Sequence, residues 1–144
     1  MSDPFDLKRF TDAQDQGETY VRALAELRAG RKQTHWMWFV FPQLAGLAES
    51  AMARRYAISG RDEARAYLAH RILGPRLLEA VAAVNAIEGR TAHEIFGSPD
   101  DMKFRSCATL FACVGDDPGV FCAALGRYYG GAEDTATLRL LARP

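Results

Sequence analysis

The sequence predicts an all-α fold, and three observations support this prediction. Gly, Pro and Asp residues divide the chain into segments that have the length of helices. Within these segments, apolar residues recur every three or four positions. β-Branched residues are few, whereas alanine is abundant. The chain has 144 residues, which suits one domain. We therefore expect a single compact helical domain over residues 1–144, with about seven or eight short helices around one core.

The first half of the chain predicts three helices. Segment 18–29 has apolar residues at helical spacing, and Gly30 follows where such a helix would end. Segment 61–70 has one apolar face and one charged face. Pro75 suits the first turn of a helix that extends to about residue 88. The expected inward positions of this third helix are Leu77, Leu78, Val81, Val84 and Asn85.

The last third predicts three more helices from their start signals. In the run Ser98-Pro99-Asp100-Asp101, the serine can cap a helix, the proline fits its first position, and the two carboxylates complement the helix dipole. Asp117-Pro118 repeats this signal, and Gly130-Gly131 ends the helix that it opens. Asp134 is expected to cap a short final helix.

Segment 34–43 is apolar on every side, so its periodicity does not distinguish helix from strand. A buried strand would need a partner strand, and the sequence predicts none. We therefore interpret the segment as a short buried helix that Pro42 ends.

Composition and charge restrict the partners. Lys+Arg and Asp+Glu each total 18, so the formal net charge is zero. The chain therefore has no net positive charge that would attract it to nucleic acid or to an anionic membrane. The acidic N-terminus does not resemble a signal peptide, and the longest aromatic-aliphatic run, 36–41, is too short to cross a bilayer. We expect a cytoplasmic protein, a monomer or weak homodimer, that binds neither nucleic acid nor membrane.

The cysteines and histidines predict no metal site and no cofactor. The three cysteines lie in apolar, helix-like surroundings without a C-x-x-C pair, and the histidines lack ligand spacing. We interpret Cys107, Cys113 and Cys122 as reduced core residues. A catalytic role for Cys107 is the alternative.

The segment around residue 35 also carries a resemblance. The runs Phe10-x-x-Ala13-Gln14, Glu26-Leu27-x-x-Gly30-x-Lys32 and His35-Trp36-Met37-Trp38-Phe39-x-Phe41-Pro42-Gln43-Leu44 resemble one family, as do later blocks such as Asp101-x-Lys103-x-x-Ser106 and Thr109-Leu110-Phe111. It is the bacterial family catalogued as domain of unknown function 1810. The resemblance spans nearly the whole chain and implies a small all-α cytoplasmic domain, but no activity. Some members are labelled calpastatin, a long disordered inhibitor that this composition does not resemble.

The lysines are the first candidate site residues. The chain uses 15 arginines but only three lysines, and two of these, Lys32 and Lys103, lie in the resembling segments. A compact ammonium group in an arginine-rich chain favours an anion-binding or catalytic role, especially for Lys103 near a helix start. The alternative is that both are ordinary surface cations.

The second group of candidates surrounds His35. Trp36 and Trp38 can stack on a planar ligand, Gln43 can supply a donor and an acceptor, and His35 can act as acid or base. The alternative is that these residues belong to the core. Ser106 and Thr109 continue a polar strip from Lys103, which either faces the His35 segment or serves helix packing alone.

These candidates lead to two hypotheses. The first is a small-ligand-binding helical domain, with or without enzymatic activity, that takes an anionic metabolite with a planar ring such as a nucleotide derivative. Lys103 would hold the anion and His35 would be its acid or base. The second is a protein-interaction module without catalysis, with an exposed apolar patch around Phe121, Tyr128 and Tyr129.

Overall fold

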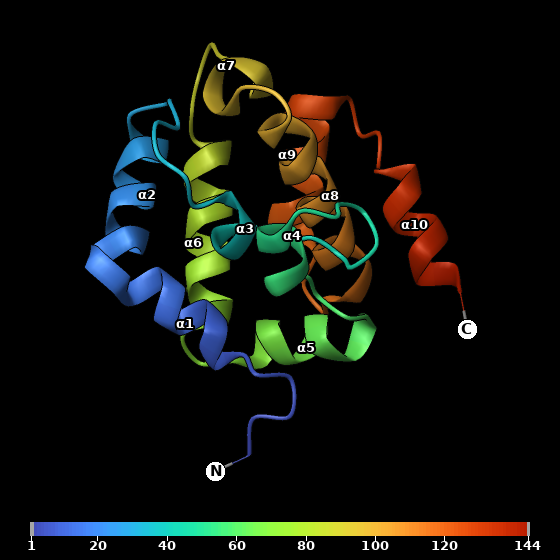
Figure 1. Cartoon of the computed structure of the whole chain (residues 1–144). Coiled ribbons are helices and arrows are strands. Elements are labelled where there is room, and N and C mark those ends of the chain that lie inside the picture. The colour runs from blue at the N-terminus through green and yellow to red at the C-terminus, as the bar shows by residue number, and fades with distance from the viewer. Residues whose placement is uncertain (1, 144) are drawn as a thin grey trace.

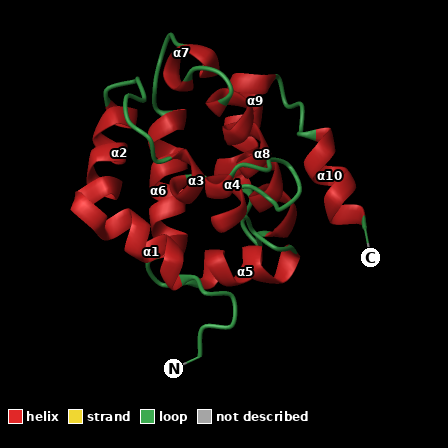
Figure 2. Cartoon of the chain, in the orientation of Figure 1, coloured by secondary structure: helices red, strands yellow, loops and turns green. Residues whose placement is uncertain are grey.

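The chain forms a bundle of short helices in the computed structural model, which describes residues 2–143 (Figures 1 and 2). These residues contain no named strand, and Leu44 and Ile58 form one isolated parallel bridge. The elements in order are α1 (Lys8–Asp15), the 3₁₀ helix η1 (Gln16–Glu18), α2 (Thr19–Arg28), α3 (Met37–Val40), α4 (Ala51–Arg55), α5 (Arg61–Ala69), α6 (Leu73–Asn85), α7 (Ala92–Phe96), α8 (Asp100–Val114), α9 (Gly119–Tyr129) and α10 (Thr135–Ala142).

Helices α6 and α8 organise the packing of the bundle. Helix α8 packs against α5, α7, α9 and α10, while α6 packs against α2, α5 and α9. Figure 1 shows α1 and α2 on one side, α10 on the other, and α5 across the end of the bundle near the N-terminus. Phe104 and Phe111 of α8 are fully buried, and their rings lie 5.0 Å from Phe41 and 5.7 Å from Phe121. An aromatic core therefore joins α8 and α9 to the residue that follows α3.

The predicted all-α class is confirmed, and so are the main helices. Asp134 caps α10 by accepting a hydrogen bond from the Thr137 amide, as expected. Segment 34–43 contains the one-turn helix α3, which ends before Pro42. The elements outnumber the expected seven or eight because one-turn helices such as α4 and α7 are too short for periodicity to reveal.

Three local predictions are wrong. Ser98 does not cap α8, whose N-cap is Pro99 without a side-chain bond. Leu78 is 42% exposed, because it lies at the solvent edge of α6, and Cys122 is exposed on α9. Cys107, in contrast, is buried as expected. Asn85 bridges α6 and α9 by donating from its amide to the Val120 carbonyl.

None of the helices in residues 2–143 is long and apolar enough to cross a membrane.

Candidate functional site

The loop between α2 and α3 is held by one carboxylate. Glu26 accepts hydrogen bonds from the amides of Gln33 (2.7 Å) and Thr34 (3.0 Å), from the Thr34 hydroxyl (2.6 Å) and from the Trp36 indole (3.0 Å). On its other side, the Lys32 amide donates to the Ile95 carbonyl at 2.7 Å. The loop is therefore fixed against both α2 and α7, and it presents Lys32 in one position.

These hydrogen bonds also determine how Glu26 ionises. Burial raises the pKa of the Glu26 carboxyl, but the bonds from Thr34, Gln33 and Trp36 stabilise the carboxylate and outweigh burial. The net pKa lies below its ordinary value. Glu26 is thus a fixed anion at neutral pH, and it anchors the segment that carries Lys32, His35 and Trp36.

Two lysines share one aspartate at the start of α8. The Lys32 ammonium lies 2.9 Å from Oδ2 of Asp100, and the Lys103 ammonium lies 3.4 Å from Oδ1 of the same side chain. Only 8% of the Lys32 side chain and 21% of the Lys103 side chain are exposed. A partly desolvated site with two cations and one carboxylate has an excess of positive charge, and this excess favours an additional anion.

Each of these lysines also lies over a tryptophan ring. The Lys32 ammonium is 5.2 Å from the Trp36 ring, and the Lys103 ammonium is 5.4 Å from the Trp38 ring. Such cation–π contacts restrict the positions of both ammonium groups. We call Lys32, Trp36, Trp38, Asp100 and Lys103 the lysine–tryptophan cluster.

The two tryptophans of the lysine–tryptophan cluster differ in accessibility. Trp36 is fully buried and its indole N–H is bonded to Glu26, so it packs in the core, which is the alternative that the sequence left open. Trp38 is half-buried and retains exposed surface. Only Trp38 can therefore present a ring to a ligand.

His35 and Gln43 flank this cluster. His35 is exposed on the fixed loop, and it has no side-chain hydrogen bond to any residue in 2–143. Gln43 is half-buried and lines, with Trp38 and Tyr56, a cavity of about 10 Å³. That volume holds about one water molecule. A ligand at Trp38 would therefore lie on the surface beside the lysines, not inside this cavity.

Ser106 and Thr109 serve a different part of the fold. The Ser106 hydroxyl donates to Asp134 at 2.9 Å, and the Thr109 hydroxyl accepts from the Asp134 amide at 2.9 Å. The Thr109 hydroxyl donates to the Arg105 carbonyl at 2.9 Å, and the Ser106 oxygen also lies 3.1 Å from the Met102 carbonyl, both on α8. The polar strip on α8 thus faces α10. Both side chains are buried against the cap of α10, so they serve helix packing, which is the alternative that the sequence left open.

The predicted interaction patch is also absent around Phe121. Phe121 is only 1% exposed, and Tyr128 and Tyr129 are half-buried. Their hydroxyls donate to the backbone carbonyls of Val84 and Asp101. These aromatic residues tie α9 to α6 and α8.

The structure adds charged residues that sequence reasoning missed. The sequence indicates Asp100 only as a complement to the helix dipole, and the spacing between Glu26 and the loop residues does not reveal their contact. Asp101, the next residue, lies 3.7 Å from the exposed His93 imidazole and within 4.0 Å of neither lysine, so its carboxylate does not join Asp100 in these ion pairs. Within residues 2–143, no group of three His, Cys, Asp or Glu side chains is placed to hold a metal ion.

A family model described as a protein of unknown function, DUF1810, matches residues 4–141. The chain belongs to this family. The resemblance found in the sequence is therefore confirmed over nearly the whole length. The family description assigns no activity.

A solved structure supports the fold of this DUF1810 chain. The conserved hypothetical protein Rv1873 from Mycobacterium tuberculosis is 56% identical, and the match covers 99% of this chain and 100% of that chain with a TM-score of 0.96. No curated protein matches the chain.

Proposed function

We propose that this DUF1810 protein binds a small anionic metabolite with a planar ring, such as a nucleotide derivative, at the lysine–tryptophan cluster. Lys103 and Lys32 hold the anion, and Trp38 contacts the ring. The single observation that carries the proposal is that two partly buried ammonium groups share only one carboxylate, Asp100.

The charge balance supports an anionic ligand. An ammonium group offers three hydrogen-bond donors, and each of the two lysines contacts Asp100 through an ion pair. The remaining donors of both lysines are near one another because a single carboxylate bridges the two groups. Phosphate or carboxylate oxygens accept such donors in charge-assisted hydrogen bonds.

The aromatic surface supports a ring on the same ligand. Trp38 is half-buried and lies against Lys103, so a molecule whose anion contacts Lys103 can place an adjacent ring on the indole. Gln43 borders the same indole and offers an amide to orient polar ring atoms. Nucleotides combine an anion with such a ring.

His35 is the candidate acid or base if the bound molecule is also converted. It lies on the loop that Glu26 fixes, and its imidazole is exposed. An imidazole is the side chain whose ordinary pKa best suits proton transfer near neutral pH. Binding without turnover would make the protein a ligand-binding domain, and turnover lost in His35→Gln would make it an enzyme.

The test is a thermal-shift screen followed by calorimetry. Purified protein is screened against nucleotides, dinucleotides and phosphorylated metabolites, because a ligand at a hundred times its Kd stabilises the fold by about 2.7 kcal/mol. We expect Lys103→Ala and Lys32→Ala to weaken the binding of a hit by roughly tenfold or more, since each removes a charge-assisted bond. Lys8→Ala is the matched control, because Lys8 is the third lysine and 73% of its side chain is exposed.

Asp100→Asn separates anion binding from a purely structural cluster. Removing the competing carboxylate is expected to tighten anion binding by about tenfold, or ~1.4 kcal/mol, while it lowers stability. A structural cluster would show only the stability loss. A hit whose affinity is the same in Lys103→Ala, Lys32→Ala and Lys8→Ala would refute the site, and a silent library would favour the alternative of a protein-interaction module.

A further inference from the structure

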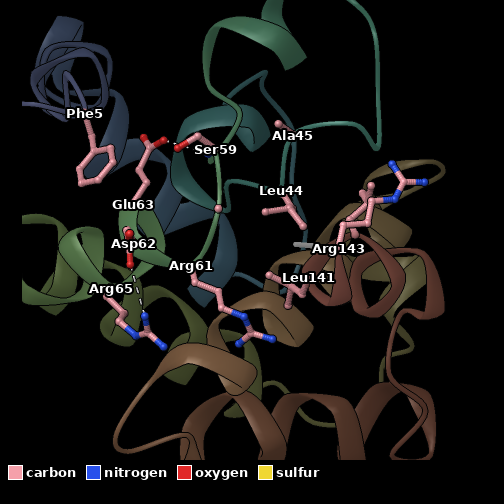
Figure 3. Close-up of a pocket in the computed structure, with 12 residues that line it drawn as sticks. Phe5, Leu44, Ala45, Ser59, Arg61, Asp62, Glu63, Arg65, Leu141 and Arg143 are labelled. Atoms are coloured by element: carbon pink, nitrogen blue, oxygen red, sulfur yellow. Dashed lines mark hydrogen bonds and ion pairs between the residues drawn. The ribbon is translucent and has the colours of Figure 1, made fainter.

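A cavity lies between the start of α5 and the end of α10, away from the lysine–tryptophan cluster. It has a volume of about 630 Å³ and is lined by three arginines, Arg61, Arg65 and Arg143, together with apolar residues. Figure 3 shows Leu44 and Leu141 between Arg61 on α5 and Arg143 beyond α10. The volume is within the range of about 300–1,000 Å³ that small-molecule sites occupy.

The carboxylates at this cavity already have cationic or amide partners. Asp62 lies 3.4 Å from the Arg65 guanidinium. Glu63 lies 2.8 Å from the Arg9 guanidinium and accepts a 2.8 Å hydrogen bond from the Ser59 amide. Asp62 and Glu63 are therefore neutralised by groups other than Arg61 and Arg143.

Arg61 and Arg143 supply the excess positive charge. Neither has an ion-pair partner among residues 2–143, and both are exposed at the cavity. A guanidinium presents a planar fork of donors that matches the oxygens of phosphate or carboxylate. Helix α5 also begins here, at Arg61, and its N-cap residue Gly60 has no side chain to cap the first amides. This adds donors to a cavity that the arginines already make cationic.

The floor of the cavity is apolar and held in place. Leu44 is 5% exposed and Leu141 is 9% exposed, so both are packed against the core and expose only a small surface. The Ile58 amide donates to the Gln43 carbonyl and the Ala45 amide to the Ile58 carbonyl, each at 2.8 Å, and these bonds fix Leu44 between them. A ligand that fits this cavity has an apolar body as well as an anion.

We propose that this cavity is a second ligand site, which takes a small organic oxyanion with its charged group between Arg61 and Arg143 and its apolar body on Leu44 and Leu141. The site is independent of the proposed function. Lys32, Lys103 and Trp38 do not line this cavity.

The full chain is titrated with butyl phosphate by calorimetry. Separate titrations with inorganic phosphate and with butanol test the charged part and the apolar part of this probe. We expect saturable 1:1 binding of butyl phosphate that is tighter than that of inorganic phosphate, because the apolar floor contributes through burial. Arg61→Ala and Arg143→Ala are each expected to weaken it by roughly tenfold or more. Arg139→Ala is the matched control, because Arg139 is exposed on α10 and does not line the cavity.

Lys103→Ala assigns the binding to one of the two sites. Butyl phosphate affinity that falls in Arg61→Ala and Arg143→Ala but is kept in Lys103→Ala and Arg139→Ala supports the second site. Affinity that falls only in Lys103→Ala places the probe at the lysine–tryptophan cluster and overturns the proposal. Equal affinity in all four variants, or no saturable binding, also overturns it. Circular dichroism melting of each variant checks that the fold is kept.

Discussion

The indole nitrogen of Trp36, the last residue of the loop between α2 and α3, donates at 3.0 Å to the carboxylate of Glu26 in the last turn of α2. Trp36 is fully buried, so this bond satisfies a donor that has no access to water. The same carboxylate binds Gln33 and Thr34. Glu26 therefore determines the position of Lys32 and His35 without itself belonging to the lysine–tryptophan cluster.

The first prediction concerns the stability that Glu26 contributes. Glu26→Ala leaves the buried Trp36 indole and the loop amides without their acceptor, and we expect the free energy of unfolding to fall by about 2–3 kcal/mol. Urea denaturation followed by tryptophan fluorescence measures this loss. Glu49→Ala, at an exposed glutamate, is the control and is expected to change stability by less than ~0.5 kcal/mol. Equal midpoints for the two variants would contradict the anchoring role.

The second prediction concerns the pH dependence of stability. The pKa of Glu26 is lowered from its ordinary value of 4.5, so its contribution is fully present above that value and is lost as the pH falls through the lowered folded-state pKa. We expect Glu26→Gln to lose less stability than the parent protein between about pH 5 and pH 3. Urea midpoints across this range give the two curves.

Glu26→Gln is expected to reduce the acid sensitivity and not to abolish it. Hydrogen bonds from the Lys8 and Leu7 amides also lower the pKa of Asp3, and those from Thr91 lower the pKa of Glu94. The variant therefore still loses free energy of unfolding as these two carboxylates become protonated. Parallel curves for the parent and Glu26→Gln would show that Glu26 does not titrate as inferred.

The sequence predicts long helices better than short ones. In α8, fifteen residues show enough repeats of the apolar period to define both the helix and its buried face. Helix α7 has five residues, and its stability depends on the capping box between Thr91 and Glu94 instead of on periodicity. Ser98, in contrast, is a start signal that the structure does not use. Serine is a residue type that commonly caps helices, but the N-cap of α8 is Pro99.

The candidate site was predictable only in part, because residue type indicates chemistry but not contacts. The scarcity of lysine identified Lys32 and Lys103, and the structure brings both to Asp100. The spacing of Ser106 and Thr109 placed them on the helix face of Lys103, yet a short α10 that packs on α8 takes up their hydroxyls. Long-range packing of this kind leaves no local signal in the sequence.

The third prediction concerns Arg9, which binds the N-terminal segment to α5. Its guanidinium donates to four backbone carbonyls, including those of Arg55 and Ala57, and pairs with Glu63 at 2.8 Å. The Glu63 side chain is only 3% exposed, so Arg9→Ala leaves a buried carboxylate without its cation. We expect a loss of about 3–5 kcal/mol in chemical denaturation. Lys8→Ala removes a neighbouring but exposed ion pair, and we expect a change below ~1 kcal/mol.

The fourth prediction concerns the cap of α10. Asp134 accepts hydrogen bonds from the Ser106 hydroxyl, the Thr137 amide and the Thr137 hydroxyl, so it joins α10 to α8. Asp134→Ala is expected to cost about 1–2 kcal/mol and to increase hydrogen exchange throughout α10. Asp134→Asn keeps an acceptor and is expected to lose less. Unchanged exchange in α10 for Asp134→Ala would contradict the capping role.

The last prediction orders the three cysteines by their reactivity toward a thiol reagent. Burial raises the pKa of the Cys107 thiol well above 9.0. The reagent therefore cannot reach this thiol, and the thiol does not form the reactive thiolate. Burial, with the Glu133 carboxylate, also raises the pKa of the Cys113 thiol, whereas Cys122 is exposed.

Disulfide exchange with an aromatic disulfide at pH 8 is therefore expected to modify Cys122 first and Cys113 more slowly. Cys107 is expected to react only in urea, and mass spectrometry of the peptides identifies each site. Cys122→Ser should remove the fast phase alone. Rapid modification of Cys107 in the native protein would mean that α8 opens readily, and it would restore the catalytic-cysteine alternative, which requires an accessible thiolate.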